Sequence, residues 1–250
     1  MKIEITGDVY GVGDIHGDTS VLRLLIEFEN ITDCTLILLG DVGIWRYRDY
    51  KHFLKFDKLC KEHNIMCYAF RGNHDNPAFF YKSEEQSPIA KRFWDKFTNF
   101  KVIPDLTRIV INGANGIVIG GACSIDRSVR RSFISEYRRY GNLYKLNDWW
   151  EGETLPNTDG IDEKFDFILS HTGPRPPKCP PLTKDNCVFF ERDYFLNDYI
   201  NSENQRLEEI REQFKPKRWW FGHYHINQVF DFIDTRCTVI DINYLTPIRM

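Results

Sequence analysis

Several features that would place a chain outside ordinary soluble enzymes are missing from this sequence. No apolar run approaches the ~20 residues of a membrane span, and the first residues lack the charged and then apolar pattern of a secretory signal. The seven cysteines are scattered, with no Cys-x-x-Cys spacing. We therefore expect a protein of the reducing cytoplasm with no membrane partner.

Neither sign of charge dominates the chain. The 33 lysines and arginines nearly balance the 36 aspartates and glutamates, which leaves a formal net charge of −3. That balance gives no support for a dedicated binder of nucleic acids or of membrane surfaces. One stretch, 127–139, holds five arginines, and we interpret it as a solvated helix face. Nucleic acid stays open as a partner, but the charge does not indicate it.

The length and the segment order indicate one α/β domain. A chain of 250 residues with 42% apolar residues can bury a sizeable core. Short apolar segments alternate with amphipathic ones, an order typical of a parallel or mixed sheet covered by helices. A charged helix is expected over 191–213, and hairpins over 108–122 and 226–243. We predict a single domain over 1–250, with loop insertions around 76–100, 124–160 and 173–190.

Five predicted strands end at residues that can bind a metal. They are Asp14 with His16, Asp41, Asn73 with His74, His171, and His223 with His225. Because sites in open α/β sheets lie beyond the carboxyl ends of the strands, these groups can converge. Five of the seven histidines occur at these strand ends, which random placement would rarely produce. Of the other aspartates nearby, Asp18 is expected to cap a helix and Asp75 to bind backbone N–H groups.

The residue types in this set define the expected chemistry. Carboxylate, amide and imidazole donors suit Zn, Mn or Fe, and the absence of thiolates argues against a closed structural zinc site. The set is too large for one ion and fits two, bridged by a carboxylate at a separation of roughly 3.5–4 Å. Such a centre lowers the pKa of a bound water. Its residual positive charge favours a phosphate ester as the substrate.

The segments that carry these residues resemble a known family. "GDIHG", "GD", "RGNHD", a histidine after "FILS", and "GHYH" occur in this order between residues 14 and 225. This order is similar to the signature of the calcineurin-like metallophosphoesterases. "GGACSIDRSVR" resembles, more weakly, segments of small bacterial and phage members. The resemblance implies a two-sheet αββα sandwich.

The resemblance also implies a role for each residue of the set. Asp14, His16 and His225 would hold one divalent transition-metal ion, Asn73, His171 and His223 a second, and Asp41 would bridge the two. His74 would not bind metal. It would stabilise charge on the phosphoryl group or protonate the leaving oxygen, so that His74 and Asp41 are the expected catalytic residues.

The arginine that binds the substrate phosphate is not evident. The segment after Asp41 lacks the Asp-Arg-Gly triplet of the protein Ser/Thr phosphatase branch. Arg46 stands nearest to its place, and Arg71, Arg127, Arg130 and Arg175 are further candidates for a guanidinium fork. A surface salt bridge is the competing interpretation for each of them.

Together these observations predict a two-metal phosphoesterase in which metal-bound hydroxide attacks phosphorus. A phosphomonoester substrate is only slightly favoured. The first alternative is a phosphodiesterase or nuclease that acts on nucleotides or nucleic acid. The second, of another class, is a non-catalytic scaffold that retains the fold.

Overall fold

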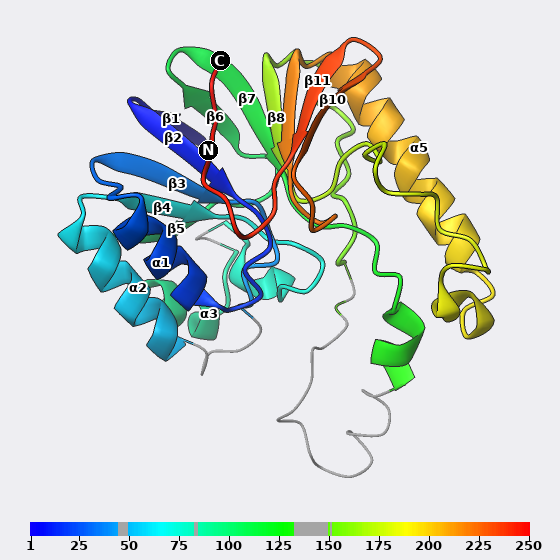
Figure 1. Cartoon of the computed structure of the whole chain (residues 1–250), viewed down its shortest axis with the longest axis horizontal. Coiled ribbons are helices and arrows are strands. Elements are labelled where there is room, and N and C mark those ends of the chain that lie inside the picture. The colour runs from blue at the N-terminus through cyan, green and yellow to red at the C-terminus, as the bar shows by residue number, and fades with distance from the viewer. Residues whose placement is uncertain (45–49, 83–84, 133–149, 151) are drawn as a thin grey trace.

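Two β-sheets lie face to face, with helices on both outer sides (Figure 1). The structure is a computed structural model, and it describes residues 1–44, 50–82, 85–132, 150 and 152–250. The chain has no helix among these residues that is long and apolar enough to cross a membrane.

The first sheet has five strands in the order β12-β2-β3-β4-β5. Their bounds are β12 (Thr246–Pro247), β2 (Asp8–Val12), β3 (Cys34–Leu38), β4 (Met66–Ala69) and β5 (Phe100–Val102). All neighbours are parallel except β12, which runs antiparallel to β2. The outer face of this five-stranded sheet carries α1 (Thr19–Phe28), α2 (Tyr50–Glu62) and α3 (Pro88–Trp94), drawn in blue to green in Figure 1.

The second sheet has seven strands in the order β1-β6-β7-β8-β9-β11-β10. The bounds are β1 (Lys2–Ile5), β6 (Arg108–Ile111), β7 (Ala114–Ile119), β8 (Phe167–Ser170), β9 (Arg218–Phe221), β10 (Gln228–Phe232) and β11 (Thr235–Val239). The long helix α5 (Leu196–Phe214) covers the outer face. Its residues Leu207, Ile210 and Phe214 are buried against the sheet.

Strand β3 illustrates why the sandwich forms. All five of its residues are buried, yet successive side chains point to opposite faces. Leu36 and Leu38 pack in the cluster beneath the helices. Ile37 belongs instead to the cluster between the sheets, which it shares with Val118 and Leu169. A continuously apolar strand is therefore covered on both faces, as a central parallel strand requires.

The predicted αββα sandwich is confirmed, and several local expectations need correction. The charged helix begins at Leu196, not at 191, because residues Val188–Glu191 form a 3-10 helix (η3). Asp193 then accepts a hydrogen bond from the N–H of Phe195, just before α5. The segment 76–100 contains α3 and the 3-10 helix η2 (Pro77–Phe79), and is not only a loop. The single-domain boundaries stay a prediction.

Candidate metal centre

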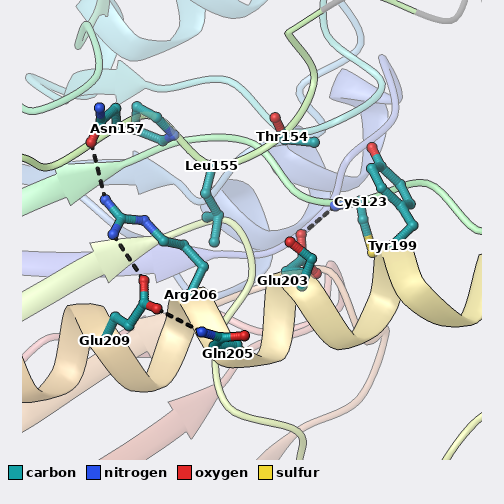
Figure 2. Close-up of a pocket in the computed structure, with 11 residues that line it drawn as sticks. Cys123, Thr154, Leu155, Asn157, Tyr199, Glu203, Gln205, Arg206 and Glu209 are labelled. Atoms are coloured by element: carbon teal, nitrogen blue, oxygen red, sulfur yellow. Dashed lines mark hydrogen bonds and ion pairs between the residues drawn. The ribbon is translucent and has the colours of Figure 1, made fainter.

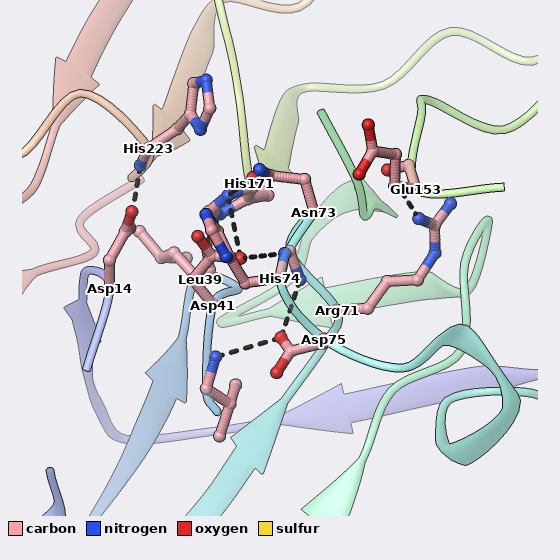
Figure 3. A network of polar contacts seen from close by, with 12 residues as sticks. Asp14, Leu39, Asp41, Arg71, Asn73, His74, Asp75, Glu153, His171 and His223 are labelled. Atoms are coloured by element: carbon pink, nitrogen blue, oxygen red, sulfur yellow. Dashed lines mark hydrogen bonds and ion pairs between the residues drawn. The ribbon is translucent and has the colours of Figure 1, made fainter. Parts of the chain in front are cut away.

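The ends of strands from both sheets meet at one place, where five of the residues expected to bind metal lie together, namely Asp14, Asp41, Asn73, His171 and His223 (Figure 3). Two backbone contacts connect the loops that follow these strands. The N–H of His16 donates to the carbonyl of Asp41 at 2.8 Å, within the first sheet. The N–H of Gly222 donates to the carbonyl of His171 at 2.9 Å, within the second. The fold therefore brings the five strand ends to a common site.

The donor atoms form two groups that share one carboxylate. In the first group, donor atoms of Asp14, His16 and His225 all lie within 4.8 Å of one another. In the second, the same holds for Asp14, His171 and His223. Each group alone offers donors of the kind that bind Zn, Mn or Fe. The site therefore offers two overlapping sets of donor atoms for a divalent ion.

Asp41 lies between the two groups. Its Oδ2 is 3.9 Å from Nε2 of His16, and its Oδ1 is 3.5 Å from Nε2 of His171. The carboxylate is 1% exposed, and the backbone N–H of His74 donates to Oδ1 at 2.8 Å. Each oxygen thus faces a histidine of a different group, an arrangement suited to a carboxylate that contacts two ions.

Asn73 has its amide orientation set by its neighbours. Its Nδ2 donates to Oγ of Ser124 at 2.8 Å, while its Oδ1 lies 2.9 Å from Nε2 of His171. Ser124 in turn donates to Oε2 of Glu153 at 2.8 Å. Glu153 also accepts from Arg130 Nη2 at 3.2 Å and from the hydroxyl of Tyr199 at 3.0 Å. This chain of buried contacts directs the oxygen of Asn73, not its nitrogen, toward the donor groups.

His74 lies beside the centre but belongs to neither donor group. Its ring meets that of His16 edge-on, with centroids 5.3 Å apart. The indole Nε1 of Trp150 donates to the backbone carbonyl of His74 at 3.2 Å, a contact that the sequence did not indicate. The side chain of His74 lines the same cavity as Asp41 and His223.

Asp75 organises the loop that carries Asp41. Its carboxylate accepts the backbone N–H groups of Val42, Gly43, Ile44 and Gly72 at 2.8–3.0 Å. Burial raises its pKa to about 6. Four donors on two oxygens suit the ionised form, which the carboxyl still adopts at neutral pH. The sequence-based expectation of backbone hydrogen bonds is confirmed here.

The glycines of the motifs leave room for the site. A Cβ on Gly72 would lie 2.0 Å from Oδ1 of Asp41, and a Cβ on Gly40 would lie 2.3 Å from Nδ1 of His171. Gly40 also has a φ of +88°, in the region that favours glycine. His16 and Asp41 themselves adopt positive φ, each at +44°. Such backbone conformations are held only where surrounding contacts enforce them.

The buried charges interact strongly. Burial raises the pKa of Asp14 to about 6. Burial also lowers the pKa of His16 to about 4 and that of His223 to about 3, so both rings are neutral and can offer a nitrogen lone pair. For Asp41 the nearby histidines, above all His171, outweigh burial and hold its pKa well below the ordinary range.

His171 carries the opposite shift. Burial alone would lower its pKa, but the carboxylates of Asp41 and Asp14 raise it to about 10. Its Nδ1 donates to the carbonyl of Leu39 at 2.8 Å, which leaves Nε2 facing Asn73 and Asp41. The two buried carboxylates therefore favour a positive charge beside this ring, and a metal ion bound here would supply one in place of the ring proton.

These residues fit a divalent ion by a further observation. Oδ2 of Asp14 is buried and has no hydrogen-bond partner within the described part of the chain, although Oδ1 accepts from the N–H of His223 at 2.8 Å. A buried carboxylate oxygen without a donor is costly unless a cation binds it. The side chains of His16 and His225 are 37% and 54% exposed, so the centre opens to solvent on their side.

The candidate arginines lie in different surroundings. Arg71 is buried, pairs with Asp105 at 2.7 Å and donates to the carbonyls of residues 152–154. Arg127 pairs with Asp193 at 2.6 Å, and Arg130 with Asp126 at 2.9 Å. These three are engaged in the interior, which does not favour phosphate binding. Arg175 lines the cavity beside the centre. Arg46 lies outside the described residues.

A sequence model described as calcineurin-like phosphoesterase matches residues 7–227. The chain belongs to the calcineurin-like phosphoesterase family. Members of this family are hydrolases that act on phosphate esters and bind divalent metals, and this chain is an enzyme of that kind. The resemblance seen in the motifs is therefore confirmed. No curated protein matches the chain.

The solved structures to which the chain is similar are distant in sequence. Protein TT1561 of Thermus thermophilus is 12% identical, with a TM-score of 0.48 over 94% of this chain and 90% of that one. A phosphopantetheinyl hydrolase from Mycobacterium tuberculosis is 12% identical, with a TM-score of 0.46 and the same coverage. An archaeal phosphodiesterase is 11% identical, with a TM-score of 0.37 over 95% of this chain and 86% of that one. Likenesses this distant do not bear on the substrate.

Proposed function

We propose that this enzyme hydrolyses a phosphate monoester with the help of two divalent transition-metal ions, Mn, Fe or Zn. The observation that carries the proposal is the pair of donor groups that share Asp14, with Asp41 facing a histidine of each. Asp14 belongs to both donor groups; in this assignment it would hold one ion together with His16 and His225. Asn73, His171 and His223 would hold the other, and Asp41 would offer one carboxylate oxygen to each.

Ions held by these residues would supply the activation of water for attack on phosphorus and would offset charge on the phosphoryl oxygens. The protein supplies the rest of the arrangement. Asp14 and Asp41 provide buried negative charge, and the contact between Asn73 and Ser124 fixes the amide. His74 is held beside the centre by its backbone N–H, which donates to Asp41. Its ring then donates a hydrogen bond to a phosphoryl oxygen, or a proton to the leaving oxygen.

A phosphodiesterase or nuclease remains the alternative activity, because a diester also fits a centre with residual positive charge. The near-neutral composition, with a net charge of −3, gives a long polyanion no general attraction. The scaffold alternative is set aside, since the family is one of hydrolases. Location in a reducing cytoplasm is a further proposal, supported by seven free cysteines.

The decisive experiment compares p-nitrophenyl phosphate with bis(p-nitrophenyl) phosphate in the presence of Mn²⁺. Asp41→Asn serves as the inactive control, because the amide removes one buried charge between the two donor groups. Faster turnover of the monoester supports the proposal, and faster turnover of the diester supports the alternative. Metal analysis of the purified protein should find about two ions per chain. One ion or none after incubation with Mn²⁺ would contradict the two-metal assignment.

A further inference from the structure

A cavity of about 580 Å³ begins at the candidate metal centre. Asp41, His74 and His223 line it, together with residues of the loop 173–190 and of helix α5. Cavities of this size are typical of sites for small molecules, which they bury for most of their surface. The space is continuous with the place where phosphorus would react, so it is where a leaving group would lie.

One wall of this cavity is apolar. Ile125, Leu182, Phe189 and Ile200 line it, and all four belong to one hydrophobic cluster between the loop and α5. None of these four residues belongs to the donor groups. The wall suits the carbon skeleton or the planar ring of a leaving group.

Two cations line the same cavity, Arg175 and Lys178. Among the described residues neither forms an ion pair with a carboxylate, and Arg175 donates only to the carbonyl of Pro180, at 3.3 Å. The acidic groups of the cavity have donors of their own: Asp41 accepts from the N–H of His74, Asp126 from Arg130, and Glu203 from the N–H of Cys123. The two cations are therefore available to an anionic ligand.

A second cavity of about 390 Å³ along α5 offers a contrast (Figure 2). Its cation, Arg206, donates to Glu209 at 3.1 Å and to the hydroxyl of Thr158 at 2.7 Å. No residue of the two donor groups lines it. Its charge is satisfied within the protein, so it gives no comparable sign of an anionic ligand.

Resting on the proposed function, we infer that the substrate is a small organic phosphate whose leaving group carries a second anionic group. The reacting phosphoryl group lies at the metal centre and the carbon skeleton lies against Phe189 and Ile200. The second anionic group, a phosphate or a carboxylate, binds to Arg175 and Lys178.

The test compares AMP with adenosine 3′,5′-bisphosphate, which carries a second phosphate on the ribose. We expect kcat/KM for the bisphosphate to exceed that for AMP by about tenfold or more, the effect of a charge-assisted contact. Arg175→Ala and Lys178→Ala should each reduce this ratio, and the double variant should bring it close to one. Lys184→Ala, which removes an exposed cation of the same loop that does not line the cavity, should leave the ratio unchanged.

Binding measured by calorimetry separates this inference from the proposed function. Tighter binding of the bisphosphate that is lost in the double variant supports the inference even if neither compound, nor p-nitrophenyl phosphate, is hydrolysed. That lack of hydrolysis would refute the proposed activity instead. A bisphosphate preference that survives in the double variant, or no preference in binding or turnover, would overturn the inference.

Discussion

Removal of the hydroxyl of Ser124 tests the buried contacts behind the proposed metal ligand Asn73. Ser124 is 2% exposed. Its Oγ accepts from Nδ2 of Asn73 and donates to Oε2 of Glu153, both at 2.8 Å. In Ser124→Ala the amide nitrogen loses its partner, whereas Glu153 keeps its contacts with Arg130 and Tyr199. The perturbation is therefore concentrated on Asn73.

The size of the effect follows from these contacts. A buried donor without a partner costs about 1–3 kcal/mol, so we expect the free energy of unfolding to fall by that amount. Because the amide is then free to rotate, its oxygen is held less firmly toward the metal centre. Loss of a contact that orients a ligand typically reduces metal affinity or activity ~10–100-fold. We expect the Mn²⁺ concentration for half-maximal activity to rise within that range.

The assay is a Mn²⁺ titration of p-nitrophenyl phosphate hydrolysis, with metal affinity measured separately by calorimetry. Ser128→Ala is the matched control, because Oγ of Ser128 has no hydrogen-bond partner among the described residues. Ser124→Thr restores a hydroxyl and should recover part of the loss. If Ser124→Ala folds and its metal requirement equals that of the wild type, Ser124 does not position Asn73.

Four other outcomes are expected. His74→Asn should lower kcat by about 10²–10⁴-fold and leave the metal content unchanged; a normal kcat would refute the assigned role. Chelation should lower the melting temperature and Mn²⁺ should restore it, because Mn²⁺ at 100 times Kd raises the free energy of unfolding by ~2.7 kcal/mol; no shift would contradict the metal site. Asp57→Ala should destabilise the fold by about 2–4 kcal/mol, measured by urea unfolding, because Asp57 accepts the N–H groups of residues 98–100. Burial raises the pKa of Glu203 to about 7, so the folded state holds a proton that the unfolded state releases near pH 4.5. Stability should therefore fall between pH 4.5 and 7 in the wild type and less so in Glu203→Gln; equal slopes would refute that shift.

The sequence was most informative where chemistry follows a strand. Asp14, Asp41 and His171 come directly after or shortly after buried apolar segments, and parallel strands bring such ends together whatever the loops do. The helix cap at Asp18 was also predictable, because its carboxylate binds the N–H of Ser20 only two residues away. The resemblance to the family signature added the proposed division of the ligands between two ions, which local pattern alone leaves open.

The tertiary structure decided what depends on distant segments. Asn73 meets Ser124 across 51 residues, and Ser124 meets Glu153 across 29, with no spacing rule that connects them. The same is true of Arg71 and Arg127, which look like phosphate ligands in the sequence but are themselves buried and pair with Asp105 and Asp193 in the fold. Local sequence determines which residues a strand end presents. Which of them remain available to a substrate depends on the partners that folding brings from elsewhere in the chain.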